Sequence, residues 1–229
     1  MFLTCDNKML WRRLGWGALI TGILVAMGIL WFDKPLFLAL RQLDCRLWSI
    51  FAKVFDGHVW IAVALVAYIV YFLKKTLKAT GECLLGKNCR NVVSAFRNFV
   101  VKTKGSYAFL ILCSVGVTGV VVKVLKIFIG RARPVFFEAL DMTGFFPPSL
   151  SWEFNSMPSG HTAVSFAGLV MIGMLAPKYK PLTWTLAIMI GVSRVAIGAH
   201  WPSDVILGAF IGMVVADLVK WTLLGKCTK

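Results

Sequence analysis

Long apolar segments dominate this chain of 229 residues and limit the folds that are open to it. Apolar residues make up 59% of the sequence and charged residues only 15%, which differs strongly from an ordinary soluble domain. A helix that spans a bilayer needs roughly 20 mostly apolar residues. Segments that approach this length are 14–32, 58–73, 106–125, 160–176, 182–199 and 203–224. We therefore predict an all-α polytopic membrane protein, a bundle of six transmembrane helices.

The length allows one domain, and no internal repeat or low-complexity stretch divides the chain. We expect residues 1–229 to form a single integral membrane domain. The first apolar segment is also compatible with a signal peptide, because basic residues precede it. It continues to Phe32 without a convincing small-x-small cleavage site, which favours a retained helix.

The formal charge of +15 raises the question of nucleic-acid binding, but the distribution of the basic residues has another explanation. They concentrate before the first apolar segment, between the second and third, between the fourth and fifth, and after the sixth. With six spans, these regions all lie on one face, which places both termini in the cytoplasm. We predict a bacterial inner-membrane protein with a periplasmic active site and no nucleic-acid partner, since no basic strand is interleaved with aromatic residues.

Residues 34–55 follow the first apolar segment and have a different pattern. Apolar side chains recur there at helical spacing, and charged residues occupy the other faces. We expect one interfacial helix that lies flat on the membrane. A clamp over the substrate is the alternative.

The first group of polar residues is Lys126 to Pro134, at the outer end of the third apolar segment, where the spacing is K-x6-R-P. Cations are costly inside a bilayer and therefore need a reason to be there. The guanidinium of Arg133 can match two phosphate oxygens, and Lys126 supplies a compact charge. Lys123 and Arg131 belong to the same stretch, and for them snorkelling to the headgroups is as good an interpretation as a site role.

The second group, Pro158-Ser159-Gly160-His161, comes directly before the fourth apolar segment. Pro and Ser are typical of a helix start, and Gly lets the backbone approach a ligand closely. The free N–H groups of a helix N-terminus bind phosphate readily. An ordinary cap with an interfacial histidine is the alternative.

The third group is Ser193-Arg194, His200 and Asp204, around the start of the sixth segment. Pro202 suits the first helical turn, so His200 should lie just outside the helix and Asp204 just inside it. Asp204 would then accept a hydrogen bond from His200 Nδ1 and leave the other ring nitrogen as a nucleophile. Alternatively, Asp204 is only an acid favoured by the helix dipole.

In order, these groups read K-x6-R-P, P-S-G-H and S-R-x5-H-x3-D. Over residues 126–204 the chain resembles the type 2 phosphatidic acid phosphatase superfamily, which includes bacterial lipid phosphatases, glucose-6-phosphatase and vanadium haloperoxidases. No motif position departs from the pattern. The resemblance implies that His200 attacks phosphorus to give a phosphohistidine, that Asp204 orients it, and that His161 protonates the leaving group and then activates water. The implied phosphate-binding residues are Lys126, Arg133, Ser159, Gly160 and Arg194.

A divalent metal is an alternative, because His161, His200, Asp204 and Glu153 all carry ligand atoms. Three nearby cations would repel such an ion, and the site lacks a cage rich in carboxylates. The six cysteines show no zinc-binding spacing. We predict an enzyme without metal or other cofactor.

The resemblance implies a metal-independent lipid phosphatase whose substrate is phosphatidate, phosphatidylglycerophosphate, undecaprenyl pyrophosphate or lipid A 1-phosphate. The Phe32–Leu36 stretch looks somewhat like the lipid A 1-phosphatase type. The aromatic loop 135–157 suits either a packed cap at headgroup level or a gate over the site. A lipid phosphotransferase and a non-catalytic lipid-phosphate-binding protein remain the alternatives, and the oligomeric state is left open. A haloperoxidase fits the six-span layout and the short chain less well. A transporter also fits less well, because the candidate polar residues gather at the outer end and no polar track is evident in the middle of the spans.

Overall fold

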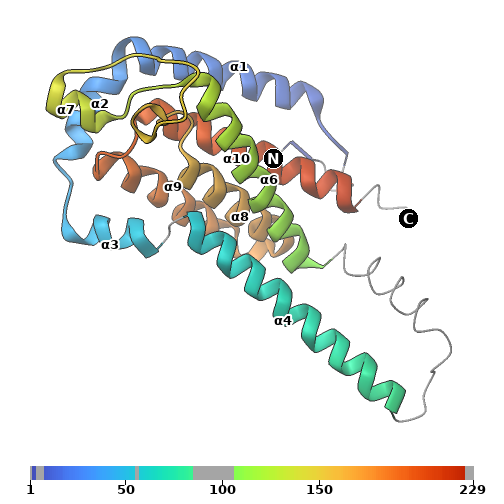
Figure 1. Ribbon diagram of the computed structural model, residues 1–229. Helices are drawn as coiled ribbons and strands as arrows, with labels where there is room; N and C mark the ends of the chain where they lie inside the picture. The colour runs from blue at the N-terminus through green and yellow to red at the C-terminus, as the bar shows by residue number, and fades with distance from the viewer. Residues whose placement is uncertain (1, 4–7, 55–56, 85–105, 225–229) are drawn as a thin grey trace.

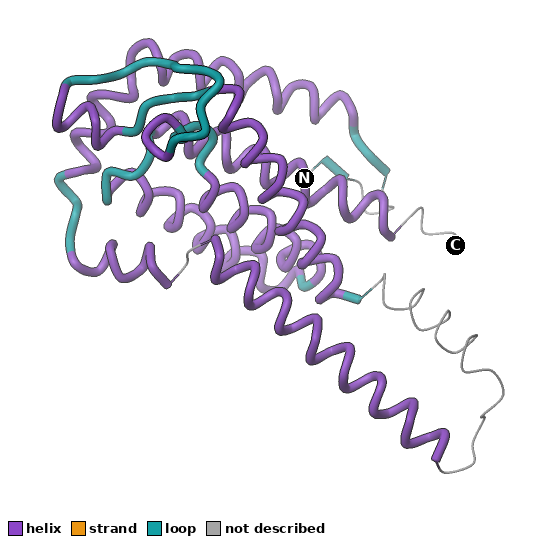
Figure 2. The backbone as a smooth tube through the Cα atoms, in the orientation of Figure 1, coloured by secondary structure: helices purple, strands orange, loops and turns teal. Residues whose placement is uncertain are grey.

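The structure is a computed structural model that describes residues 2–3, 8–54, 57–84 and 106–224. Helices account for nearly all regular structure in these ranges, and no β-strand occurs within them (Figure 2). Much of the predicted basic connection between the second and third apolar segments, 85–105, lies outside the described residues.

The helices follow one another along the chain as drawn in Figure 1. Their bounds are α1 Trp11–Met27, α2 Asp33–Arg41, α3 Arg46–Val54, α4 Gly57–Leu84, α6 Tyr107–Ile129, α7 Pro134–Leu140, α8 Gly160–Leu175, α9 Lys180–Ala196 and α10 Pro202–Leu224. A π-helical turn, Gly28–Phe32, joins α1 to α2, and short 3₁₀ turns occur at Trp152–Phe154 and Pro177–Tyr179.

Helix α8 forms the centre of the bundle and packs against α6, α9 and α10. The core around it includes Leu110, Phe166, Met171, Ile190 and Val215. Small residues allow the close approach of α8 and α10, because a Cβ at Gly208 would lie 2.6 Å from the carbonyl oxygen of Ser159. This packing brings the N-termini of α8 and α10 together.

A helix occupies each of the six predicted apolar ranges. Among the residues that the structure describes, three continuous helical stretches are long and apolar enough to cross a membrane: Trp11–Arg41, Tyr107–Ile129 and Pro202–Leu224. Ile61–Lys74 and Gly160–Leu175 are apolar but shorter. Many large apolar side chains of α1, such as Leu19 and Ile23, are exposed, as expected of a helix that faces lipid. The prediction of an all-helical membrane protein is confirmed, whereas the number of spans remains a prediction.

Residues 34–55 differ from the single interfacial helix that we expected. They form two helices, α2 and α3, and α2 follows α1 without a break in the helical stretch, through the π-helical turn. Phe37 of α2 is fully buried, with its ring 5.2 Å from that of Trp201. Arg41 ends α2 by bonding Asp44, Glu138 Oε1 at 2.9 Å and the carbonyl of Ala196. These contacts hold α2 against the bundle, and the helix therefore ends at Arg41.

Candidate active site

The residues of the three motifs converge at one end of the bundle, beneath the long loop that connects α7 to α8 (Figures 1 and 2). The beginning of α1 and the end of α10 lie at the other end. Helix α6 stops at Gly130, whose φ of 60° is left-handed and suits glycine. The loop then folds back on this end, because Gly130 O accepts from the N–H of Phe146 at 2.7 Å and Ala132 N–H donates to Gly144 O at 3.0 Å.

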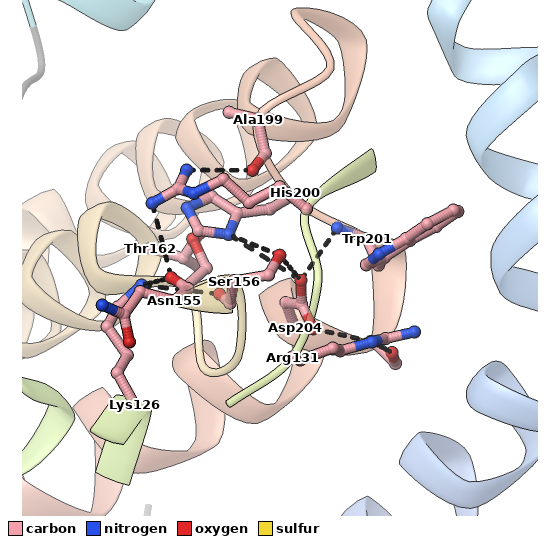
Figure 3. A network of polar contacts seen from close by, with 12 residues as sticks. Lys126, Arg131, Asn155, Ser156, Thr162, Ala199, His200, Trp201 and Asp204 are labelled. Atoms are coloured by element: carbon pink, nitrogen blue, oxygen red, sulfur yellow. Dashed lines mark hydrogen bonds and ion pairs between the residues drawn. The ribbon is translucent and has the colours of Figure 1, made fainter. Parts of the chain in front are cut away.

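His200 and Asp204 form the centre of the site (Figure 3). Both are buried, and His200 Nδ1 lies 3.8 Å from Asp204 Oδ2. Ser156 Oγ donates to the same carboxylate oxygen at 2.5 Å, and the backbone N–H of Trp201 donates to it at 3.0 Å. Nδ1 therefore faces the carboxylate at a distance beyond a hydrogen bond, and Nε2 is the ring nitrogen on the far side; the predicted hydrogen bond remains a prediction.

Burial lowers the pKa of the His200 imidazole well below its ordinary value. The carboxylate of Asp204 opposes this effect, but the charges of Lys126 and Arg133 lower the pKa further. His200 is therefore neutral at neutral pH, which is the state that a nitrogen nucleophile requires.

Lys126 and Arg133 both point to the backbone of the loop before α8. Lys126 Nζ, in the last turn of α6, donates to the carbonyl of Asn155 and approaches that of Ser156 at 3.5 Å. Arg133 Nε donates to Trp152 O at 2.9 Å, and its guanidinium lies 4.3 Å from the centre of the Trp152 ring. Burial, followed by the charge of Arg194, lowers the pKa of Arg133 to about 10, so it stays cationic at neutral pH.

Ser159, Gly160 and His161 occupy the N-terminus of α8. The N–H of Ser159 donates to Asp204 O at 3.0 Å, and its Oγ lies 2.9 Å from Thr162 Oγ1. A Cβ at Gly160 would lie 3.7 Å from Lys126 Cε, so this backbone runs close to the lysine side chain. His161 follows as the second residue of α8 and is partly buried.

Arg194 lies in the last turn of α9. Its carbonyl accepts from the N–H of Ala199 at 3.0 Å and of His200 at 3.2 Å, which fixes the path from α9 into the site. The positive charge of Arg194 acts on Lys126 and on Arg133, and it lowers the pKa of Arg133. Arg194 therefore belongs to the same group of cations.

Arg131 does not snorkel, so that interpretation of it is wrong. Its side chain is buried, and Nη1 donates to Asp204 Oδ1 and Ser203 Oγ, each at 2.6 Å. Nη2 donates to Asp33 Oδ2 at 2.6 Å. Burial by itself would lower the pKa of Arg131, but the charges of Asp204 and Asp33 outweigh it and raise the pKa above its ordinary value. Lys123, the other cation for which snorkelling was an interpretation, is exposed.

Asp33, Ser156 and Ser203 also belong to this network, and none of them was predicted from the sequence. Ser156 and Ser203 have no distinctive local signal, because serine is common in loops and at helix starts. Asp33 gave one signal, a carboxylate at the end of an apolar segment, but its partner is distant in the sequence.

No group of three or more His, Cys, Asp and Glu side chains is arranged to hold a metal ion within the described ranges. The predicted independence of metal rests on the chemistry of the donors, since the charged side chains next to His200 are mainly cations. It remains a prediction.

Cations and a helix N-terminus can bind a phosphate group, and a neutral histidine beside a carboxylate can attack it. Residues 107–226, more than half of the chain, match the PAP2 superfamily. The chain belongs to this superfamily, as its motifs predicted, and is a hydrolase that acts on phosphoesters.

Individual relatives agree with this membership. A lipid A 1-phosphatase of Rhizobium etli is 33% identical over 188 residues, which cover 82% of this chain and 75% of that protein. One from Rhizobium johnstonii is 29% identical over 216 residues, or 88% of this chain and 81% of that protein. An undecaprenyl-diphosphatase of Sulfolobus acidocaldarius is 31% identical over 112 residues, covering 45% of this chain and 53% of the relative. The crystal structure of Aquifex aeolicus LpxE has the same fold, with a TM-score of 0.54 and 19% identity over 82% of this chain and 94% of that one.

Proposed function

We propose that this chain removes the phosphate of a membrane lipid through a covalent intermediate on His200. The observation that carries the proposal is the buried pair of His200 and Asp204, whose Nδ1 and Oδ2 lie 3.8 Å apart beside the cations Lys126 and Arg133. A neutral imidazole, oriented by a carboxylate and surrounded by positive charge, is suited to attack an anionic phosphorus centre.

In the first step, His200 Nε2 forms a bond to phosphorus while the bond from phosphorus to the lipid oxygen breaks. His161, in its protonated form, donates a proton to that oxygen as it leaves. Asp204 stabilises the positive charge that develops on His200. In the second step, His161 takes a proton from water, the water oxygen bonds to phosphorus, and the N–P bond breaks. Inorganic phosphate leaves, and both histidines return to their starting states.

The phosphate would bind to Lys126, Arg133, Arg194 and the donors of Ser159 and Gly160. In the structure, Lys126 and Arg133 donate to neutral carbonyl groups of residues 152–156. A phosphate dianion is a stronger acceptor than a carbonyl, so it should take over these donors. Charge on the phosphoryl oxygens is thereby stabilised without a metal ion.

Lipid A 1-phosphate is the substrate best supported by the comparisons. The two Rhizobium relatives named lipid A 1-phosphatase align over 82% and 88% of this chain, so the similarity extends beyond residues 107–226. The undecaprenyl-diphosphatase aligns over only 45% of this chain. Because the motif residues bind phosphate in either case, the choice of lipid should depend on regions outside them.

We further propose six spans, with both termini in the cytoplasm and the site at the periplasmic face of an inner membrane. The positive-inside distribution of the basic residues supports this orientation. The placement of the site at the end of the bundle away from the start of α1 and the end of α10 agrees with it.

The test is phosphate release by the detergent-purified protein from the four lipid phosphates named above, with excess chelator and with His200→Ala in parallel. Release from lipid A by the wild type and not by the variant would support the proposal. Preference for another lipid would revise the substrate alone. Transfer of label to an acceptor lipid without free phosphate would indicate a phosphotransferase, and binding without turnover a non-catalytic protein.

A further inference from the structure

Asp33 is a buried carboxylate that the mechanism above does not use. It is the first residue of α2, and it lies outside the 107–226 region that matches the superfamily. Its side chain is nearly inaccessible, at 3% exposure, although it follows a helix whose surface is largely exposed. A carboxylate in such a place needs partners, since an unpaired buried charge is very costly.

The partners of Asp33 are Arg131 and Ser203, and both lead to the nucleophile. Asp33 Oδ2 accepts from Arg131 Nη2 at 2.6 Å and from Ser203 Oγ at 2.5 Å. Asp33 Oδ1 accepts from the backbone N–H of Ser203 at 2.9 Å. Ser203 is the second residue of α10 and directly precedes Asp204, so Asp33 caps the first turn of the helix that carries Asp204.

We propose that Asp33 is a positioning residue of the phosphatase site, which acts through Arg131 and Ser203 to hold the carboxylate of Asp204 against His200. The inference rests on the proposed function, because it assigns Asp33 a role in that reaction. It also gives the α1–α2 segment a part in catalysis.

The geometry of the guanidinium explains how this works. One arm of Arg131 binds Asp33 and the other binds Asp204 Oδ1 at 2.6 Å, so the two carboxylates fix its plane. With Oδ1 held in this way, Oδ2 is the oxygen that faces His200 Nδ1. Loss of Asp33 would leave Arg131 free to tilt, and the orientation of Asp204 would loosen with it.

The charges of the network favour the same role. Two carboxylates and one guanidinium leave one negative charge, which faces the ring of His200 as that ring becomes positive. The positive charges of Lys126 and Arg133 also act on this ring, and His161 lies on the adjacent α8. Buried ion pairs add little to stability compared with apolar packing of similar volume. A functional reason for a buried Asp–Arg–Asp arrangement is therefore more plausible than a stabilising one.

The experiment is a double-mutant cycle on the full chain in detergent. Asp33→Asn is measured in the wild-type background and in the Asp204→Asn background, with phosphate release from dioctanoyl phosphatidate as the assay. We expect kcat to fall about tenfold in the wild-type background, the magnitude typical of residues that orient a directly acting side chain, with KM nearly unchanged. In the Asp204→Asn background the same change should cost less than about twofold, because the group on which Asp33 acts is already lost.

Asp44→Asn is the matched control, since Asp44 is an exposed carboxylate that pairs with Arg41 just after α2. It should keep wild-type activity. If Asp33→Asn does not purify as a folded protein, Ser203→Ala takes its place in the cycle, because it removes the hydroxyl that contacts both Asp33 and Arg131 without removing a charge.

Equal losses in both backgrounds would show a merely structural effect and overturn the inference. A wild-type protein that releases phosphate, together with an inactive His200→Ala, would at the same time leave the proposed function intact. A wild type without activity on dioctanoyl phosphatidate and on each of the other three lipid phosphates would instead count against the proposed function itself.

Discussion

Asp204 Oδ2 is shared by two donors, Ser156 Oγ at 2.5 Å and the backbone N–H of Trp201 at 3.0 Å, while it faces His200 Nδ1 at 3.8 Å. The other oxygen, Oδ1, accepts a hydrogen bond from Arg131 Nη1. Both oxygens of this carboxylate are thus held by hydrogen-bond donors of the protein itself. Such preorganisation is what fixes the direction in which the imidazole presents its free nitrogen.

The orientation of His200 by Asp204 predicts a large effect of Asp204→Asn. The amide keeps the shape of the side chain but loses the charge that stabilises a positive imidazole. We expect kcat to fall by about two to four orders of magnitude with little change in KM. Steady-state phosphate release checks this, and a KM effect without a kcat effect would contradict the assignment.

The proposed role of His161 as general acid predicts a dependence on the leaving group. His161→Ala should lower the rate on a lipid phosphate by about 10²–10⁴. With p-nitrophenyl phosphate, whose leaving group needs no proton, formation of the intermediate should be nearly as fast as in the wild type. A pre-steady-state burst of p-nitrophenol in His161→Ala tests this. An equal loss on both substrates in the first step would argue against His161 as the acid.

The lowered pKa of His200 predicts an imidazole that stays neutral in mildly acidic solution. A group whose folded pKa is depressed takes up its proton only at a pH below the ordinary value near 6.5. The chain has three histidines, so an NMR titration of isotope-labelled histidine is simple to assign. The resonance that His200→Ala removes should not titrate between pH 7 and 6. A midpoint near 6.5 would contradict the account.

The close approach of α8 and α10 predicts an asymmetry between two glycines. A Cβ at Gly212 would lie 2.9 Å from Phe166 Cβ and would meet the backbone of α8, whereas a Cβ at Gly116 has nothing within 4 Å. Gly212→Ala should destabilise the protein by about 1–3 kcal/mol, the usual cost of overpacking. Gly116→Ala is the control and should leave the thermal midpoint in detergent unchanged or slightly raised. Equal midpoints for the two variants would contradict the packing.

Chelation offers a further test of the chemistry. The cations Lys126, Arg133 and Arg194 are proposed to do what a metal ion does in other phosphatases. Activity should therefore persist in excess chelator, measured after dialysis against it. Strict dependence on added magnesium would show that this role is wrongly assigned.

Family membership could be predicted from the sequence because the motif residues occupy unusual positions for polar side chains. Lys126, Arg133 and His200 are polar groups at the ends of apolar segments, and such groups seldom lie there without a function. Arg131 and Lys123 share that signal, but one is buried in the site and the other is exposed. Local sequence could not separate them, since the partner Asp33 is 98 positions away from Arg131.

The prediction for residues 34–55 failed for a similar reason. Apolar side chains recur at helical spacing across the whole stretch, so the pattern alone gives no break. The break follows Arg41, which is fixed by Glu138 and by the carbonyl of Ala196. Those partners come from distant parts of the chain, and only the tertiary structure brings them to Arg41.

The stereochemical course at phosphorus tests the central claim most directly. A phosphate ester made chiral with oxygen isotopes and sulfur would be hydrolysed by the wild-type protein, and the configuration of the released thiophosphate would be determined. A phosphohistidine on His200 requires two in-line displacements, so the account predicts overall retention. Overall inversion would mean that water attacks the lipid phosphate directly, and it would contradict the proposed mechanism.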